Sequence, residues 1–417
     1  MHSKKHIIAF QFYDRDSYSG GPAINAVRIL SEFHKQGHEV HALVPYFVDY
    51  PNAKELIKAG VCCHTVPKQK YTIDEVKWYS KKLEEIQPDI FVPNISAAAG
   101  FLTPYLTKSG IATVMTHRGD DPLNWGHALY FSSDTDYKCS AIVCVSSYLQ
   151  QGVLSKNGQD NIVKVIPSGV PLSNFKADLT KGTSSLVYAG RLEEKPKRIS
   201  LMFEMFKHAK ETNTELKLTL VGGRKESIKK YMGIARDMHI EKDIKFKGPL
   251  YGDEYKKELS QHHCILLFSE HEGLAGSIMD GMSCGLIPIV TPLKGIEDLI
   301  DNGFNGFIIN ANKEDLYNVI STLNSNIIQP TEISNNAIQT IEKDFSTSSS
   351  VNSWLNLFGS ITHNIDKVVY SSPSNLLLPK PNKLLLEYTS TPTFIQRIRD
   401  KLQLRTKIRL YFNKLVS

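Results

Sequence analysis

The chain has 417 residues, of which 41% are hydrophobic and 22% are charged, with a formal net charge of +6. These proportions are ordinary for a water-soluble globular protein, and the length is sufficient for two domains with separate cores. The first apolar run, residues 7–12, contains Gln11 and ends before Asp14, so it is too short for a secretion signal or a membrane span. We therefore expect a cytoplasmic protein, with a peripheral position on the cytoplasmic face of the inner membrane as the alternative.

The cysteines support a reducing environment. None of them has the spacing of metal ligands, and most lie in apolar runs, so we expect reduced and buried side chains. The adjacent pair is interpreted as part of a buried strand. The six cysteines are at positions 62, 63, 139, 144, 264 and 284.

The N-terminal half of the chain alternates between strand-like and helix-like segments. A strand over 6–13 is followed by a glycine pair and by a helix over 23–35, in which apolar residues recur at helical spacing. The alternation continues with strands over 39–45, 61–66, 89–93, 112–116, 141–146 and 163–166, and helices over 54–59, 73–86, 97–108 and 147–155.

A second alternating set follows the polar linker 173–185. Strands are predicted over 185–189, 217–221, 244–247, 264–268, 286–291 and 306–309, and helices over 199–212, 227–239, 253–262, 277–284, 313–324 and 333–344. Two such sets predict an α/β protein with two Rossmann-like, doubly wound domains facing a cleft. The predicted units are an N-terminal domain 1–172, a C-terminal domain 186–345, a helix 346–364 that crosses back to the first domain, and an extension 365–417.

The stretch Ser269–Gly285 connects a buried strand to a helix through a glycine-rich turn. Ser277, with Asp280 three positions later, is predicted to cap that helix. A turn of this kind aims the amides of a helix N-terminus at the edge where open α/β sheets bind anions. Glu272 opens the turn, and its carboxylate and that of Asp280 can accept hydrogen bonds from sugar or ribose hydroxyls.

A basic cluster follows the first strand of the second set. It comprises Arg191, Lys195, Lys197 and Arg198, and the next strand ends in Gly222-Gly223. Fixed cations beside a helix N-terminus can stabilise the charge that develops on a diphosphate leaving group. Taken alone, a basic cluster is more often a solvated face.

Two features of the first half add to this set. Gly20-Gly21 before a helix would let the backbone approach a ligand closely, and a plain surface turn is the alternative. His117 ends a strand beside Asp120 and Asp121, where ligand groups of an open α/β sheet lie, and a purely structural histidine is the alternative.

In their order and spacing, these motifs resemble the retaining glycosyltransferases of the group 1, family 4-like type, which have the GT-B fold. The resemblance runs from about residue 6 to residue 360. The matching stretches are Gly20-Gly21, Gly37–Val40, Pro88–Ile90, Thr116–Gly119, Val145-Ser146, Ile166–Val170 with Phe175, Gly190–Leu192, Val221–Gly223, Ser269–Val290 and Gly303–Phe307.

The resemblance implies roles for the matched residues. Arg191 and either Lys197, which we favour, or Lys195 would hold the donor diphosphate, and His117 would contact the donor sugar. Glu272 would bind the transferred sugar, and Asp280 would hold the nucleotide ribose. The remaining donor-binding residues implied are Gly20, Gly21, Gly222, Gly223, Gly273, Leu274, Ala275 and Gly276.

The resemblance also implies the reaction and its requirements. The family transfers a sugar with retention from a nucleotide diphosphate, usually without a required metal, so we expect no metal and no cofactor. The sequence departs from the family at Asp280, where the motif has glutamate, and at Pro171, where aspartate is common. The shorter Asp280 weakens the ribose assignment, and the alternative is that it only caps its own helix.

The C-terminal extension has a different composition. Residues 371–381 are rich in serine and proline and are predicted to form a linker. From Thr393 onward, apolar residues fall near helical spacing, with seven basic residues against one acidic residue, Asp400. A basic amphipathic helix over 393–417 suits an anionic membrane surface, and packing on the protein itself or on a partner is the alternative. Nucleic acid is not expected as a partner.

We therefore expect a transferase that moves a sugar from a UDP- or GDP-sugar to a hydroxyl of a glycan or lipid-linked acceptor. The expected setting is the synthesis of a cell-surface glycan or lipopolysaccharide. The alternative is a weak or inactive relative that binds nucleotide sugar within a glycan-assembly complex. A dinucleotide oxidoreductase is disfavoured, because no Gly-x-Gly-x-x-Gly follows the first strand.

Overall fold

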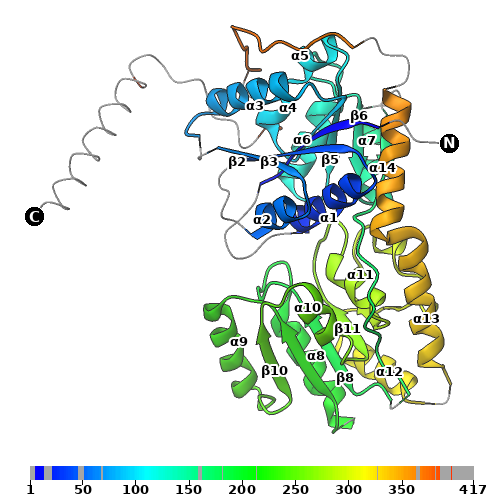
Figure 1. Ribbon diagram of the computed structural model, residues 1–417. Coiled ribbons are helices and arrows are strands. Elements are labelled where there is room, and N and C mark those ends of the chain that lie inside the picture. The colour runs from blue at the N-terminus through cyan, green and yellow to red at the C-terminus, as the bar shows by residue number, and fades with distance from the viewer. Residues whose placement is uncertain are drawn as a thin grey trace, which may run out of the picture.

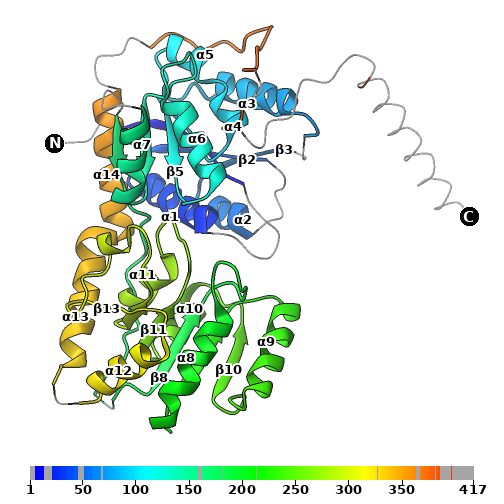
Figure 2. The same ribbon diagram turned by 180° about the vertical axis from the view of Figure 1, so that it is seen from behind.

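The computed structural model contains two α/β domains, with a helical segment running along one side of both (Figure 1 and Figure 2). Gly20 and the predicted basic helix 393–417, apart from residue 396, lie outside the described residues. The structure describes residues 5–13, 21–45, 51–66, 69–157, 162–180, 182–212, 214–325, 327–362, 367–380, 382–385 and 396.

The N-terminal domain is built on a seven-stranded parallel sheet with the strand order β3-β2-β1-β4-β5-β6-β7. Its strands are β1 (Ile7–Gln11), β2 (Glu39–Pro45), β3 (Cys62–Val66), β4 (Ile90–Asn94), β5 (Ala112–His117), β6 (Ala141–Cys144) and β7 (Val163–Val165). Its helices are α1 (Gly21–Lys35), α2 (Pro51–Lys58), α3 (Thr72–Ile86), α4 (Ala97–Gly100), α5 (Thr103–Lys108), α6 (Pro122–Ser132) and α7 (Ser147–Asn157). The single helix expected over 97–108 is thus two short helices, the second with Pro104 in its first turn.

The C-terminal domain has a six-stranded parallel sheet with the order β10-β9-β8-β11-β12-β13. Its strands are β8 (Ser185–Ala189), β9 (Lys217–Val221), β10 (Ile244–Gly248), β11 (Cys264–Leu267), β12 (Ile287–Val290) and β13 (Phe307–Ile308). Its helices are α8 (Ile199–Thr212), α9 (Lys225–Asp237), α10 (Gly252–Leu259), α11 (Gly276–Ser283), the 3-10 turn Ile296–Asp298, α12 (Lys313–Leu323) and α13 (Pro330–Thr340).

All strand pairs in both sheets are parallel, so the carboxyl ends of neighbouring strands meet at one edge of each sheet. This arrangement confirms the predicted pair of Rossmann-like domains. One prediction about a strand is wrong: Cys62 and Cys63 lie in β3, but Cys62 is exposed and Cys63 is only half-buried. The other four cysteines are buried.

The chain crosses between the domains twice, and the two crossings are bonded to each other. The amide of Val170 donates to the carbonyl of Phe345 at 2.9 Å, and the amide of Thr347 donates to the carbonyl of Val170 at 3.0 Å. A π-helical turn over Ile341–Phe345 then leads into α14 (Thr347–Ile361), whose first turn is capped by the Ser346 hydroxyl.

Helix α14 packs against the N-terminal domain rather than the C-terminal one. The side chains of Trp354 and Phe358 are buried in a core shared with β1 and α1. The Trp354 ring lies edge-to-face with Phe10, with 6.5 Å between the ring centroids. Helix α14 therefore supplies part of the core of the first domain.

Residues 367–380 and 382–385, which include the described part of the linker predicted over 371–381, pack along the N-terminal domain (orange in Figure 1). Lys367 forms an ion pair with Asp89 at 2.9 Å, and the buried Tyr370 hydroxyl bonds that of Ser80 at 2.7 Å. Leu376 and Leu385 are buried in the core on this side of the sheet. The segment is thus a structural part of the domain, although it contains no regular helix or strand.

We predict that Trp354→Ala lowers the free energy of unfolding by about 3–5 kcal/mol, because a large buried side chain is replaced by a cavity. Urea unfolding followed by circular dichroism measures the change. Asn352→Ala, at an exposed position of the same helix, is the matched control and should be close to neutral. Equal midpoints for the two variants would mean that the docking of α14 contributes little to stability.

Candidate functional site

The loops at the carboxyl ends of strands from both sheets meet between the domains. Gly273, in the loop after β11, lies against the loop after β5. A Cβ atom on Gly273 would be only 1.6 Å from the carbonyl oxygen of Arg118. Glycine is therefore required for this contact, which brings the two predicted halves of the site together.

An ion pair joins two of the predicted site residues within the C-terminal domain. The Lys197 ammonium bonds the Glu272 carboxylate, and the two side chains are 13% and 20% exposed. The backbone supports this pair, because the Pro196 carbonyl accepts a hydrogen bond from the Glu270 amide at 2.8 Å. The loop after β8 and the loop after β11 therefore form one continuous surface.

The Arg198 side chain holds that surface by hydrogen bonds to residues that follow β11 and β12. Its Nε donates to the carbonyl of Phe268 at 2.6 Å, and its Nη2 donates to the carbonyl of Ser269 and the hydroxyl of Thr291, both at 2.9 Å. Phe268 and Ser269 directly follow β11, and Thr291 directly follows β12. Arg198 thus holds the glycine turn in place and is not directed toward a ligand.

The other two cations of the basic cluster lie apart from Glu272. Arg191 is half exposed, with its Nη1 3.0 Å from the Glu193 carboxylate. Lys195 is exposed and has no ion-pair partner in the part of the chain that the structure describes. The structure therefore brings Lys197, and neither Arg191 nor Lys195, into contact with the predicted sugar-binding acid.

The glycine pair at the end of β9 lies directly under the loop that carries Arg191. Gly222 and Gly223 have φ angles of +113° and +81°, which favour glycine. A Cβ atom on Gly222 would be 2.3 Å from the carbonyl oxygen of Gly190, and one on Gly223 would be 2.7 Å from Leu192. The pair is needed so that this loop can approach the end of β9.

The helix after the glycine turn begins earlier than predicted. Helix α11 starts at Gly276, and Ala275 occupies the N-cap position without a side-chain cap, so the predicted cap at Ser277 is wrong. Leu274 packs against the cores of both domains, while Ala275 is buried. Among the described residues, no atom outside its own helix lies within 4 Å of a Cβ placed on Gly276, so this first turn is open to them.

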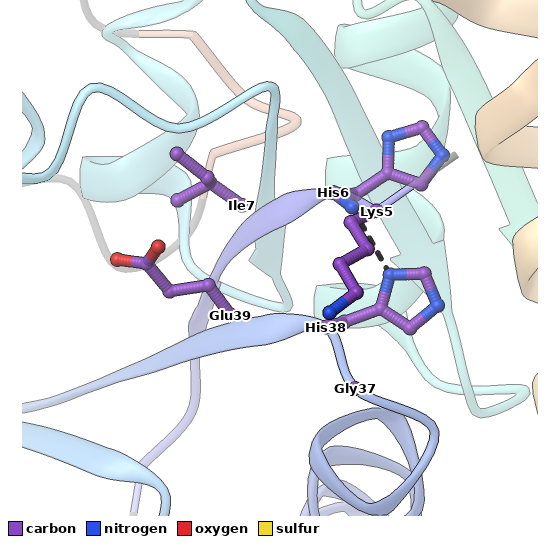
Figure 3. Close-up of a pocket in the computed structure, with 6 residues that line it drawn as sticks. All are labelled: Lys5, His6, Ile7, Gly37, His38 and Glu39. Atoms are coloured by element: carbon purple, nitrogen blue, oxygen red, sulfur yellow. Dashed lines mark hydrogen bonds between the residues drawn. The ribbon is translucent and has the colours of Figure 1, made fainter. Parts of the chain in front are cut away.

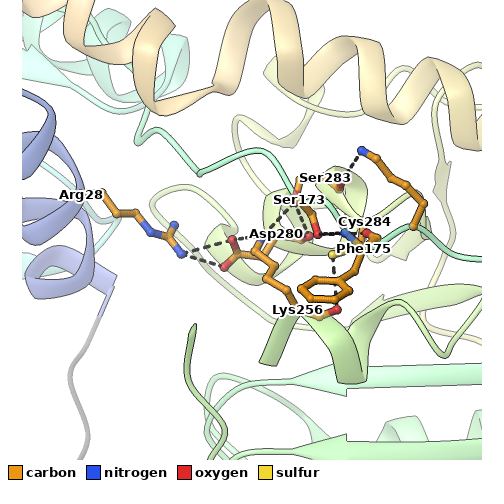
Figure 4. A network of polar contacts seen from close by, with 8 residues as sticks. Arg28, Ser173, Phe175, Lys256, Asp280, Ser283 and Cys284 are labelled. Atoms are coloured by element: carbon orange, nitrogen blue, oxygen red, sulfur yellow. Dashed lines mark hydrogen bonds and ion pairs between the residues drawn. The ribbon is translucent and has the colours of Figure 1, made fainter. Parts of the chain in front are cut away.

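Asp280 faces the other domain and does not cap its helix (Figure 4). Its two carboxylate oxygens each lie 3.2 Å from Nη2 of Arg28 on α1, and Oδ1 lies 2.8 Å from Nζ of Lys256 on α10. Burial alone would raise the pKa of the Asp280 carboxyl, but the charges and hydrogen bonds of these two cations hold its pKa below the ordinary value. Asp280 is thus an ionised group shared by the two domains.

His117 is fully buried at the end of β5, with its ring edge-to-face against Trp125 at 4.4 Å between centroids. Neither ring nitrogen has a hydrogen-bond partner among the described residues. Burial lowers the pKa of His117 to about 4, although Asp121 and Asp120 oppose the shift. The imidazole is therefore neutral at neutral pH, and it can donate or accept one hydrogen bond.

The two acids beside His117 have structural partners. Asp121 caps α6, a helix that the sequence analysis missed, by accepting from the Asn124 amide at 3.0 Å. Asp120 accepts from the Trp125 indole at 2.7 Å and lies 3.4 Å from Lys294 of the other domain. The sequence does contain a signal for α6, because an aspartate followed by a proline, here Asp121-Pro122, is typical of a helix start.

A surface pocket of about 330 Å³ lies at the opposite end of the N-terminal sheet (Figure 3). It is lined by residues at the starts of β1 and β2, including His6 and His38. Ligands of open parallel sheets bind at the carboxyl ends of the strands, so this pocket is not the candidate site.

Neither a candidate metal site nor a candidate membrane span is present among the described residues. No three or more histidine, cysteine, aspartate or glutamate side chains gather there in a way that could hold a metal ion. None of the helices described there combines the length and hydrophobicity needed to cross a bilayer.

Two parallel-sheet domains with their strand ends facing each other define the GT-B class of proteins. The family model described as Glycosyltransferase Family 4 matches residues 19–174, and the model described as Glycosyl transferases group 1 matches residues 172–340. The chain therefore belongs to the group 1 glycosyltransferases, as the motifs predicted.

Curated relatives match part of the chain. A poly(ribitol-phosphate) alpha-N-acetylglucosaminyltransferase of Staphylococcus aureus strain COL is 28% identical over 167 residues, which are 39% of this chain and 33% of that protein. CapH of Staphylococcus aureus, a capsular polysaccharide biosynthesis glycosyltransferase, is 27% identical over 154 residues, or 37% of this chain and 43% of that protein. The matched regions thus span less than half the length of these relatives.

Among solved structures, Anabaena HepE in complex with UDP and glucose is similar with a TM-score of 0.70. The match covers 85% of this chain and 100% of that chain at 17% sequence identity. At this identity the likeness establishes the shared fold alone.

Several residues of the site were not selected from the sequence. Arg28 and Lys256 hold Asp280, yet they lie on ordinary amphipathic helices and belong to no motif. Arg118 is part of the Thr116–Gly119 match, but no role was assigned to it. Its position directly after β5, at the carboxyl edge of an open sheet, is the feature that could have marked it as a site residue.

We predict that Asp280→Asn lowers the free energy of unfolding by about 3–5 kcal/mol at neutral pH, because it leaves the buried Lys256 and the half-buried Arg28 without their anion. The native pKa of Asp280 lies below its unfolded value, so this stabilisation is present above about pH 4 and is lost as the pH falls through the native pKa.

Thermal unfolding of wild type and Asp280→Asn between pH 3 and pH 7 measures this effect. The difference in Tm should be largest at neutral pH and should shrink below about pH 4. Glu254→Gln, which removes an exposed carboxylate from α10, is the control and should change little. A difference that stays constant over the whole pH range would contradict the assignment.

Proposed function

We propose that this protein transfers a sugar, with retention, from a UDP- or GDP-sugar to a hydroxyl of a cell-surface or cell-wall glycan acceptor. Membership of the group 1 glycosyltransferases supports a transferase. The named activities of the two Staphylococcus aureus relatives support cell-wall or capsule glycan synthesis, and HepE with UDP supports a nucleotide-sugar donor. We further propose a cytoplasmic location, where nucleotide sugars are available.

The observation that carries the proposal is the ion pair between Lys197 and Glu272 at the glycine turn. We infer that the donor replaces this pair. Lys197 would then contact the diphosphate, with Arg191 beside it, while Glu272 would accept hydrogen bonds from hydroxyls of the transferred sugar. The pair keeps both charges satisfied until the donor supplies other partners.

In the proposed reaction, the bond between the anomeric carbon and the donor phosphate oxygen breaks, and the acceptor oxygen bonds to the anomeric carbon on the same face. The proton of the acceptor hydroxyl passes to the leaving phosphate. Fixed cations lower the barrier because they stabilise charge on the leaving diphosphate without having to reorganise. Neutral His117 would give one hydrogen bond to the donor sugar.

The alternative is a protein that binds nucleotide sugar without efficient transfer. The position of Asp280 favours it, because this acid is bonded to Arg28 and Lys256 and so is not free to hold a ribose. The two functions differ in one measurement. Release of UDP or GDP from a panel of nucleotide sugars, with and without a glycan acceptor, should exceed the uncatalysed rate only if the protein is a transferase.

We predict that Lys197→Met lowers kcat by about 10²–10³-fold, because it removes a fixed cation from the leaving group. Lys195→Met removes an equal charge from an exposed position two residues away and is the matched control. It should retain activity within about threefold, because a solvent-exposed charge contributes little in water. The reverse order of effects would assign the diphosphate to Lys195.

We also propose that no metal is required, because Arg191 and Lys197 can offset the diphosphate charge. Initial rates in excess EDTA should therefore stay within about twofold of those in Mg²⁺, as the Lewis-acid role is filled by fixed cations. A large loss of kcat in EDTA that Mg²⁺ or Mn²⁺ restores would contradict this proposal.

A further inference from the structure

Arg118 is a cation that has only neutral hydrogen-bond partners among the described residues. It follows His117 at the carboxyl edge of the N-terminal sheet, and its carbonyl contacts Gly273 of the other domain. Its Nε donates to Oδ1 of Asn94 at 3.0 Å, and its Nη1 donates to Oδ1 of Asn25 at 2.8 Å and to the Ser168 hydroxyl at 3.4 Å. All of these acceptors are neutral.

The nearby carboxylates are engaged elsewhere. Asp121 caps α6, Asp120 bonds Trp125 and lies beside Lys294, and Glu272 pairs with Lys197. Arg118 forms no ion pair within the described ranges, and its Nη2 has no partner there. Burial lowers the pKa of Arg118 to about 10, so the guanidinium still carries its charge at neutral pH. Arg118 is half-buried, and charges drawn out of water are normally paired, so this one calls for an anion.

The amides around Arg118 supply further unused donors. A guanidinium only donates hydrogen bonds, so the oxygens of Asn25 and Asn94 must face it and their NH₂ groups must point elsewhere. Both NH₂ groups are buried, and neither has a hydrogen-bond partner among the described residues. The side chain of Gln11, at the end of β1, is also fully buried and without a partner there. Orphaned buried donors of this kind are destabilising unless a ligand or water satisfies them.

We propose that Arg118, with the NH₂ groups of Asn25 and Asn94, binds a phosphate or carboxylate group of the acceptor. This inference rests on the proposed transferase function. Glu272 and Lys197 on the C-terminal domain and His117 on the facing domain are assigned to the donor, so Arg118 and the two amides carry no donor assignment and are left for the acceptor. The planar guanidinium fork matches the two oxygens of a phosphate or carboxylate.

The test is calorimetric titration of the full chain, saturated with UDP, with glycerol 3-phosphate, malate and neutral glycerol. Wild type should bind at least one of the two anions and should not bind glycerol. Arg118→Gln should weaken anion binding at least tenfold, and Arg118→Lys should lie between the two, because lysine keeps the charge and loses the fork. Lys108→Gln removes an exposed charge from the same domain and should bind like wild type.

A separate titration with UDP alone distinguishes the two proposals. Binding of UDP by wild type and by Arg118→Gln within about twofold of each other, together with loss of anion binding, supports the acceptor site. If Arg118→Gln instead loses UDP affinity, Arg118 serves the donor phosphates and the inference is wrong. It is also wrong if wild type binds UDP but neither anion, or if Arg118→Gln binds them equally well. Failure of wild type to bind any nucleotide diphosphate would count against the transferase function itself.

Discussion

The carboxylate of Asp280 is buried between the two domains, and one cation from each domain neutralises it. The pairing is a constraint on the whole molecule, because an uncompensated charge at this depth would cost several kcal/mol. Separating the domains would return Arg28 to water while leaving Asp280 with Lys256. The arrangement with the two sheets facing each other is therefore favoured electrostatically, before any substrate contributes.

Two further polar contacts between the domains also favour the arrangement in which the sheets face each other. The Asp298 carboxylate accepts a hydrogen bond from the Ser147 amide at 2.6 Å, at the N-terminus of α7, where a negative charge is favoured. Lys294 bridges to Asp120 and Tyr148 of the first domain. Loops of the two domains are thus held together by several charged contacts in addition to Asp280.

Much of the fold could be predicted from the sequence, because each strand and helix of a doubly wound sheet has its own hydrophobic period. Strands β2, β8 and β9 and helix α8 lie over the expected residues. Segments whose stability comes from distant contacts could not be predicted. Residues 367–385 lack any period, and single side chains such as Tyr370 and Leu376 hold them in place.

The same distinction applies to the site. Glycine positions were informative because a backbone that must pass within van der Waals distance of another leaves a local signature, as at Gly222 and Gly273. The ion pair of Asp280 with Arg28 could not be predicted, because the two residues are 252 positions apart and no local pattern links them. Arg118 was visible as part of a motif, but its lack of an anion became apparent only from its neighbours in space.

The bonded crossings at Val170 and at Phe345–Thr347 have a mechanical consequence. Because both connections pass through one place, a rotation about that place would separate the domains without breaking the hydrogen bonds between the crossings. Helix α14 is packed in the core of the N-terminal domain. A small change of the backbone angles just before Thr347 would therefore be enough to rotate the C-terminal domain relative to it. Arg28 and Asp280 lie on α1 and α11, which pack against α14 and the Ile341–Phe345 turn, so their contact moves less than the loops remote from the crossings.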